Sequence, residues 1–520
     1  MRFVTDPPIA TKIAKMKQRV RWGEAAITQR GIDQTTLVLE DGQDDRTDFS
    51  FLVLGDSGSG PHRGHHPQRR IAEGMLEHRN DCRFVLHTGD VIYLVGSREF
   101  YGLNFIQPYR EFLVDGVKST FDGMVFNQPF LTVPGNHDYY DLPLAFGALA
   151  QVTAPLRYLL RSRLDLDIGW RGSVQGNDYA RAFLDYLRAL SPAELERHLD
   201  SHYTAKTETG RCLSYQPGQF TRQPNRYYTF RAGGIDFFAI DSNTFNVPTP
   251  LPNTRQGQLV RQQLEEQSTK IDRQMQEVLE QSASFDPSNP DHAEQLDDLQ
   301  AKLEQLAEVK KDLDKQLSSD KATPIDLEQL DWLQHRLIES WHTESVRGRV
   351  LFFHHPPYVT EATKWHQGQT LAIRDRLRQV LDGVAAAVGE RAKGRAVVDL
   401  VLNGHAHCLE YLRTQNTGHA DSHTNWIVCG GSGYSLRRQR QEGTQISEGL
   451  DDLRGEVSET IAQSHLYVGR SGIGTLKRRP YSFLRIDVQA GSQPKFVVRP
   501  FVSERFQRRW HDYAIKPFTI

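Results

Sequence analysis

The sequence predicts an α/β fold, because apolar runs that suit buried strands alternate with amphipathic stretches that suit helices. Nearly every one of five short polar blocks directly follows such an apolar run. In open α/β sheets the functional site lies at the carboxyl ends of the strands, so we expect the five blocks to meet there. The blocks are Gly55-Asp56-Ser57-Gly58, Gly89-Asp90-Val91-Ile92-Tyr93, Gly135-Asn136-His137-Asp138, His354-His355-Pro356 and Gly404-His405-Ala406-His407.

The strands expected before the blocks are short and apolar, as buried strands are. A hairpin is also expected, because two apolar runs that end at Asp241 are joined through Gly233-Gly234. Further strands are expected at 426–429 and 481–488. The strand ranges before the five blocks are 51–54, 83–88, 128–133, 349–353 and 397–402.

Several helices are predicted from apolar residues at helical spacing, at 8–22, 327–337 and 370–388. Residues 255–281 and 293–317 are rich in Glu, Gln, Lys and Leu, and apolar residues recur in both at heptad spacing. Pro287 and Pro290 interrupt the run between them. We expect an antiparallel helical hairpin that projects from the core as a coiled coil; the alternative is a helical layer packed on the main domain.

Composition limits the class of protein. Hydrophobic residues make up 38% of the 520 residues, which allows a packed core, and the formal charge of −2 implies no general surface for nucleic acid. Four cysteines without CxxC spacing predict free thiols. Neither an export signal nor an apolar run long enough to span a membrane is recognised, so a cytoplasmic protein is expected.

The polar blocks supply oxygen and nitrogen ligands that suit two cations side by side. Asp90 is the natural bridging ligand, because a carboxylate has two oxygens. Asp56 and the histidines would each serve one cation, and Asn136 would add a neutral oxygen. His405 and His407 stand two residues apart and can reach different metals.

Such a pair of cations would lower the pKa of a shared water and clamp phosphoryl oxygens for in-line displacement, which is standard chemistry for phosphate ester hydrolysis. The leaving alkoxide needs a proton. His137 follows a candidate ligand and has a free imidazole, which suits a general acid. Asp138 would hold that imidazole or a ligand histidine.

The five blocks resemble those of the calcineurin-like metallophosphoesterase superfamily. That family's first block usually reads Asp-x-His, but position 58 here is Gly58. In its purple acid phosphatase branch, a tyrosine three residues after the bridging aspartate replaces that histidine, and Tyr93 stands three residues after Asp90. The resemblance implies a four-layer α/β/β/α sandwich.

The resemblance also implies the ligands and the metals. A tyrosinate favours Fe(III) beside a divalent Fe, Zn or Mn; a Mn/Mn pair is the alternative. His354 is preferred to His355, which would then face substrate, and His62, His65 and His66 are candidate substrate contacts or a polar loop. The first metal would be held by Asp56, Asp90, Tyr93 and His407, and the second by Asp90, Asn136, His354 and His405.

The sequence therefore predicts a metal-dependent phosphoesterase that cleaves phosphate monoesters of small molecules. A phosphodiesterase for cyclic nucleotides or phospholipid headgroups is the alternative, and an interaction protein built on this scaffold is another. The 253–322 hairpin is a candidate surface for a protein partner or self-association. The expected divisions are an N-terminal segment at 1–47, the domain at 48–500 with insertions at 141–225 and 253–322, and a tail at 501–520.

Overall fold

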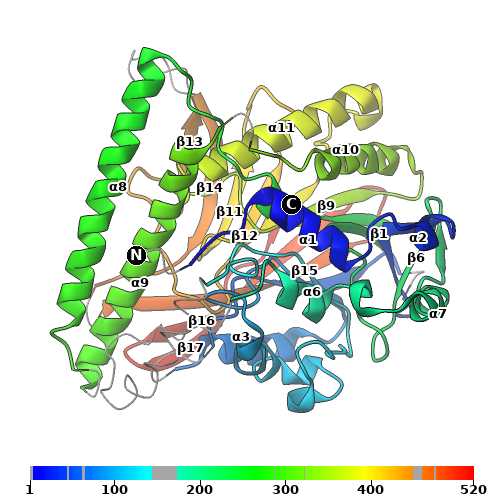
Figure 1. Cartoon of the computed structure of the whole chain (residues 1–520), viewed down its shortest axis with the longest axis horizontal. Helices are drawn as coiled ribbons and strands as arrows, with labels where there is room; N and C mark the ends of the chain where they lie inside the picture. Colours follow the sequence, from blue (N-terminus) through cyan, green and yellow to red (C-terminus); the bar gives the residue numbers. More distant parts are fainter. Residues whose placement is uncertain are drawn as a thin grey trace.

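The computed structural model describes residues 4–43, 46–60, 65–142, 172–286, 289–320, 323–448, 459–473 and 476–520. Two β-sheets pack face to face, with helices outside each (Figure 1). The larger sheet has the order β13 (Gln445–Glu448), β14 (Glu459–Val468), β11 (Leu409–Thr414), β12 (Asn425–Cys429), β10 (Leu400–Asn403), β9 (Gly348–Phe353), β8 (Ile235–Ala239), β7 (Tyr228–Ala232), β1 (Ile32–Leu39), β6 (Gly210–Tyr215) and β5 (Ala205–Thr207).

The smaller sheet has the order β17 (Arg509–Ala514), β16 (Lys495–Phe506), β15 (Arg478–Gln489), β2 (Phe49–Leu54), β3 (Cys82–His87) and β4 (Phe130–Thr132), with β18 (Phe518–Thr519) paired to β16. The helices are α1 (Ile9–Arg19), α2 (Ala25–Thr28), α3 (Pro67–His78), α6 (Asn177–Phe183), α7 (Pro192–His202), α8 (Arg255–Ser282), α9 (Pro290–Ser318), α10 (Leu327–His342) and α11 (Gly368–Val388). Short helical turns lie at Arg98–Phe100, Gly102–Ile106, Arg110–Phe112, Gly116–Lys118, Leu187–Ala189, Ser242–Thr244 and Gly389–Ala392.

Alternation along the strands builds four layers, because successive side chains point to opposite faces of a sheet. In β2, Phe51 and Val53 enter the core between the sheets, whereas Leu52 and Leu54 face the core beneath α3. In β8, Phe237 lies between the sheets, whereas Phe238 packs with residues of α10 and α11. The predicted α/β/β/α sandwich is therefore the observed fold.

Segments near both ends of the chain contribute strands to the sheets. β1, in the expected helical and extended N-terminal segment at 1–47, pairs with β6 and β7 in the larger sheet. Residues 501–520 are not a tail, because they complete β16 and form β17 and β18. Such pairings join residues far apart in sequence, so local patterns give little sign of them.

The 141–225 insertion contributes helices, as expected, and also strands. α6 and α7 lie in it, and β5 and β6 extend the larger sheet beyond β1. Its residues 143–171 lie outside the described part of the chain. Among the described helices, none combines the length and apolar character needed to cross a bilayer.

α8 and α9 pack side by side, and α9 lies between α8 and the sheets (Figure 1). Leu264 and Ile271 of α8 cluster with Leu313 of α9, so the heptad residues do join the two helices. α9 does not project, however: its Asp298 accepts a hydrogen bond from Arg470 Nη2 at 2.8 Å, and its backbone meets Arg437. Two arrangements were expected, a hairpin that projects from the core and a helical layer packed on the main domain. α9 has the second arrangement.

We predict that Phe84→Ala destabilises the fold by about 3–5 kcal/mol, the usual cost of deleting a buried aromatic ring. Phe84 is fully buried between the sheets and stacks on Phe51 with centroids 5.1 Å apart. Urea unfolding measures the effect. Val117→Ala is the control, because Val117 is 59% exposed, and its free energy of unfolding should stay within about 0.5 kcal/mol. If Phe84→Ala and Val117→Ala changed the free energy of unfolding equally, the described core would be contradicted.

Candidate metal centre

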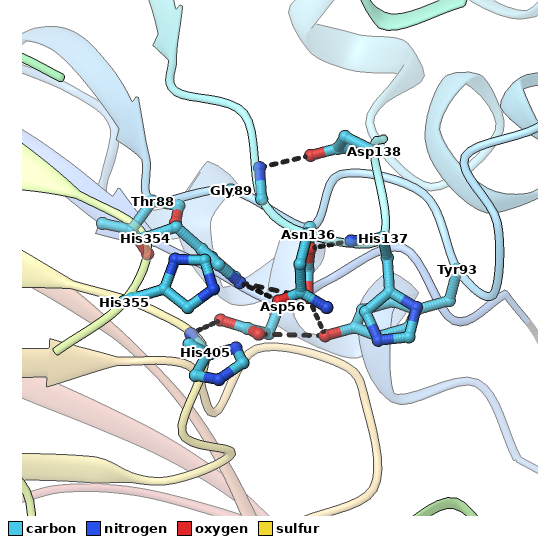
Figure 2. Close-up of polar contacts among 12 residues, drawn as sticks. Asp56, Thr88, Gly89, Tyr93, Asn136, His137, Asp138, His354, His355 and His405 are labelled. Atoms are coloured by element: carbon cyan, nitrogen blue, oxygen red, sulfur yellow. Dashed lines mark hydrogen bonds and ion pairs between the residues drawn. The ribbon is translucent and has the colours of Figure 1, made fainter. Parts of the chain in front are cut away.

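The five blocks converge at one place in the molecule. β2, β3 and β4 run parallel in the smaller sheet, and β9 and β10 run parallel in the larger one. Each block follows its strand directly or after a short link, so the carboxyl ends of strands in both sheets contribute side chains to one buried cluster (Figure 2).

The Tyr93 hydroxyl lies at the centre of one group of candidate ligands. It donates toward Asp56 Oδ1 at 2.9 Å and Asp90 Oδ2 at 2.8 Å, and it lies 3.3 Å from His407 Nε2. Figure 2 shows the phenol directed at Asp56. These are the four residues that the resemblance implies for the first metal.

A second group meets the first at Asp90. His354 Nε2 lies 2.9 Å from Asn136 Oδ1 and 3.3 Å from Asp90 Oδ2. Donor atoms of Asp56, Asp90 and His354 lie within 4.8 Å of one another, and so do those of His354, His355 and His405. Asp90 thus contacts both groups of candidate ligands.

The ring orientation of two histidines suits metal binding. His354 Nδ1 lies 2.9 Å from the Thr88 carbonyl oxygen, and His407 Nδ1 lies 3.0 Å from that of Ser435. A proton on Nδ1 would be donated to each carbonyl, which leaves Nε2 as the ligating atom.

The backbone brings the carboxylates together in an uncommon conformation. Asp56, Asp90 and His405 have φ values of 53°, 54° and 64°, and side chains in this left-handed region are sparse outside functional sites. Two amides fix the carboxylates: His405 N donates to Asp56 Oδ2 at 2.8 Å, and His137 N donates to Asp90 Oδ1 at 2.8 Å.

Gly58 explains why the first block lacks a ligand side chain at that position. A Cβ built on Gly58 would lie 1.8 Å from the Val91 carbonyl oxygen, so the second block leaves no room for one. Tyr93 N donates to Gly58 O at 2.9 Å, and this contact fixes Tyr93 beside the gap. The missing side chain and the tyrosine are therefore parts of one local arrangement.

Burial and close contact shift the pKa values of the buried groups in the cluster. Burial and the neighbouring Asp90 raise the pKa of Asp56 well above its usual value. Burial alone would lower the pKa of His354, but Asp90 raises it to about 9. Burial lowers the pKa of His407 to about 3, which keeps the imidazole neutral, the form that binds metals. Cations would relieve the repulsion between the two carboxylates.

Asp138 does not hold an imidazole as expected. Its carboxylate accepts hydrogen bonds from the backbone amides of Val91 at 3.1 Å, Ile92 at 3.3 Å and Gly135 at 2.9 Å. His137 Nδ1 lies instead 2.5 Å from the Leu94 carbonyl oxygen. Asp138 therefore ties the second block to the third, because adjacent side chains in this turn point in different directions.

The remaining histidines differ in position. His355 is buried, and its Nδ1 lies 2.8 Å from Ser242 Oγ. His66 accepts a hydrogen bond from Arg69 N at 3.2 Å as the N-cap of α3, which is a structural role. His65 contacts Arg505, and His62 lies outside the described residues.

Two residues of the cluster were missed by sequence reasoning. The Tyr434 ring stacks on Tyr93 with centroids 3.8 Å apart and planes 6° apart, and Arg437 N donates to His407 O at 2.9 Å. Both follow β12, which is parallel to β10. The signal was the run Gly430-Gly431-Ser432-Gly433 directly after an apolar strand.

No family model matches the chain, and no curated protein matches it in sequence. Solved structures that are distantly similar to the chain include the following three. GAP50, the anchor in the inner membrane complex of Plasmodium, is 10% identical with a TM-score of 0.37, over 91% of this chain and 89% of that one. The purple acid phosphatase PPD1 from yellow lupin (Lupinus luteus) is 11% identical with a TM-score of 0.40, over 91% and 53%. PhoD is 10% identical with a TM-score of 0.36, over 92% and 70%. Similarity at this level carries no argument about activity.

We predict that Asp90→Ala abolishes binding of both metals, because its carboxylate is shared by the two ligand groups. His405→Ala should remove one metal of the pair. Plasma mass spectrometry of the purified proteins gives the metal-to-protein ratio. Asp115→Ala is the control, because Asp115 is exposed, and it should bind as many ions as the parent protein. Unchanged metal content in Asp90→Ala would contradict the assignment.

Proposed function

We propose that this chain is a binuclear metal-dependent phosphoesterase that hydrolyses phosphate monoesters. The observation that supports it is the buried convergence of two carboxylates, a phenol, an amide oxygen and three imidazoles about Asp90. Bound cations would activate water and neutralise phosphoryl oxygens. The residues of the proposed centre are Asp56, Asp90, Tyr93, Asn136, His354, His405 and His407.

His137 is the proposed general acid. The contact of its Nδ1–H with the Leu94 carbonyl fixes the ring, and in the imidazolium form Nε2 carries the proton that would pass to a leaving alkoxide. The ring lies against Tyr93, with centroids 4.2 Å apart, so it borders the candidate centre. Asp138 acts in this proposal as a backbone tie between the blocks that carry Asp90 and Asn136.

Tyr93 supports an iron assignment for the first metal. A phenol that reaches both Asp56 and Asp90 would bind as a tyrosinate, and the resemblance that the sequence shows implies Fe(III) with divalent Fe, Zn or Mn. The same residues would also hold a Mn/Mn pair. The two assignments differ in colour, because a tyrosinate on Fe(III) absorbs visible light.

We predict that His137→Ala lowers kcat more for phenyl phosphate than for p-nitrophenyl phosphate. Phenoxide is the more basic leaving group and needs the proton more, so a loss of about 10²–10⁴-fold is expected for phenyl phosphate. Steady-state assays measure both esters, and the metal content should stay at the parent value. An equal loss on both esters would count against His137 as the acid.

A purple colour is predicted for the iron-loaded protein, and Tyr93→Phe should lose it. Visible absorption before and after the substitution measures the change, with Tyr513→Phe as control, because Tyr513 is 44% exposed on β17. A colourless active protein that binds Mn alone would exclude the iron assignment.

The rates of hydrolysis of p-nitrophenyl phosphate and of its bis ester test whether the protein prefers monoesters or diesters. A faster reaction with the diester would favour a phosphodiesterase.

A further inference from the structure

Charged side chains hold one face of α9 against the rest of the domain, whereas apolar residues of the helix pack with α8. Glu308 Oε2 lies 2.9 Å from Lys364 Nζ, and Lys315 Nζ lies 2.8 Å from Asp6 Oδ2. Positions 308, 312 and 315 recur at helical spacing, so Asp312 belongs to the same face. Asp312 is 3% exposed, which places its carboxylate within the contact between α9 and the domain.

Asp312 caps the start of α11 from outside that helix. The first amides of a helix have no partner within it, and Gln367, the residue before α11, makes no capping hydrogen bond with its side chain. Asp312 instead accepts hydrogen bonds from Gly368 N at 2.8 Å and from Gln369 N at 3.0 Å. A Cβ on Gly368 would lie 2.5 Å from Gln316 Cγ, so α9 packs directly on this turn. α9 therefore fixes the backbone position of Gln369.

The side chain of Gln369 reaches a candidate ligand. Gln369 is 8% exposed, and its Nε2 lies 3.3 Å from His405 Nε2 and 2.7 Å from Gln367 Oε1. An amide nitrogen can only donate, so His405 Nε2 accepts and carries a lone pair, as a metal ligand must. Gln369 thus contacts the proposed site of the second metal, although it lies outside the five blocks.

The carboxamides of Gln369, Gln367 and Asn246 form a buried polar group beside His405. Asn246 Nδ2 lies 3.5 Å from Gln369 Oε1 and 3.4 Å from His355 Nε2. Gln367 is 4% and Asn246 1% exposed, yet among the described residues Gln367 Nε2 and Asn246 Oδ1 have no hydrogen-bond partner. Buried polar atoms without partners are costly, so this group suits a polar ligand.

A metal on His405 would release the amide of Gln369. One lone pair serves one partner, so the N–H group that points at His405 Nε2 would need another acceptor. In the proposed reaction that acceptor is an oxygen of the substrate's phosphoryl group. A hydrogen bond to a charged oxygen is stronger than one between neutral groups, so the exchange would favour substrate binding.

We propose that the Gln369 carboxamide donates to a phosphoryl oxygen of the substrate beside the second metal, and that Asp312 of α9 holds it there. Gln369 is then a substrate-binding residue and Asp312 a positioning residue, so α9 contributes to substrate affinity without touching the substrate. This inference rests on the proposed function, and it names a substrate contact that the five blocks do not supply.

Inorganic phosphate is the first probe, because its binding needs no turnover. Calorimetric titration of the metal-loaded protein gives Kd. Gln369→Met should raise Kd about tenfold or more, the worth of a hydrogen bond to a charged group, and should keep the parent's metal-to-protein ratio. Gln379→Met is the matched control, because Gln379 is exposed on the same helix. An unchanged Kd in Gln369→Met would overturn the contact, and so would loss of a metal, which would make the amide a support of the metal site.

Asp312→Asn tests the role of α9. The two oxygens of Asp312 accept different backbone amides, so an amide group cannot replace both. The substitution should raise Kd for phosphate, and adding Gln369→Met should raise it little further, because both changes remove the same contact. Asp331→Asn is the control, because Asp331 is exposed on α10. Additive increases, or an unchanged Kd in Asp312→Asn, would contradict positioning by α9.

Steady-state kinetics with phenyl phosphate separate this contact from the proposed function. Gln369→Met should raise KM with little change in kcat, the pattern expected when an interaction with both substrate and transition state is lost. If the ester is hydrolysed but KM and the phosphate Kd of Gln369→Met equal those of the parent, the contact is wrong and the phosphoesterase proposal stands. If no ester is hydrolysed but Gln369→Met weakens phosphate binding, the phosphoesterase proposal fails and the contact stands.

Discussion

The structure of the candidate centre depends on the burial of the Asp90 carboxylate among the five loops. One oxygen accepts the His137 amide, and the other lies 2.8 Å from the Tyr93 hydroxyl and 3.3 Å from His354 Nε2. A buried carboxylate is costly unless such partners surround it. Moving the third or the fourth block would remove one of these partners, so the burial of Asp90 fixes those two blocks relative to the second.

The packing of the two sheets brings the candidate ligands around Asp90 together. Asp90 and Asn136 follow strands of the smaller sheet, whereas His354 and His405 follow strands of the larger one. The aromatic core between the sheets, with Phe51 and Phe237 in edge contact at 5.5 Å, holds the two sets of strand ends at a fixed separation. Packing far from the centre therefore positions its ligands.

Much of the fold and of the candidate centre could be predicted from the sequence. Local apolar runs and polar blocks predicted the strands and the candidate ligands, because strand ends in α/β folds gather polar residues. The hairpin at Gly233-Gly234 was equally local, and both glycines have positive φ, at 53° and 74°. The position of β1 and of the last strands was not predictable, because pairing partners distant in sequence decide it.

The direction in which a side chain points also could not be predicted from the sequence. Asp138 stands beside His137 in sequence, yet its carboxylate turns to backbone amides. In α9 the heptad leucines correctly predicted the contact with α8. They gave no information about the charged face of the same helix, which contacts the domain. Asp312 on that face accepts a hydrogen bond from Gln369 N, and Gln369 Nε2 lies 3.3 Å from His405 Nε2. Tertiary contact alone shows which face of such a helix meets the domain.

Anomalous X-ray scattering from crystals of the metal-loaded protein tests the central claim most directly, because it locates each metal without reference to activity. The account predicts two peaks on opposite sides of the Asp90 carboxylate, one beside Tyr93 and His407 and the other beside Asn136 and His354. No peak at Asp90, or a single peak held by His354, His355 and His405 alone, would contradict it.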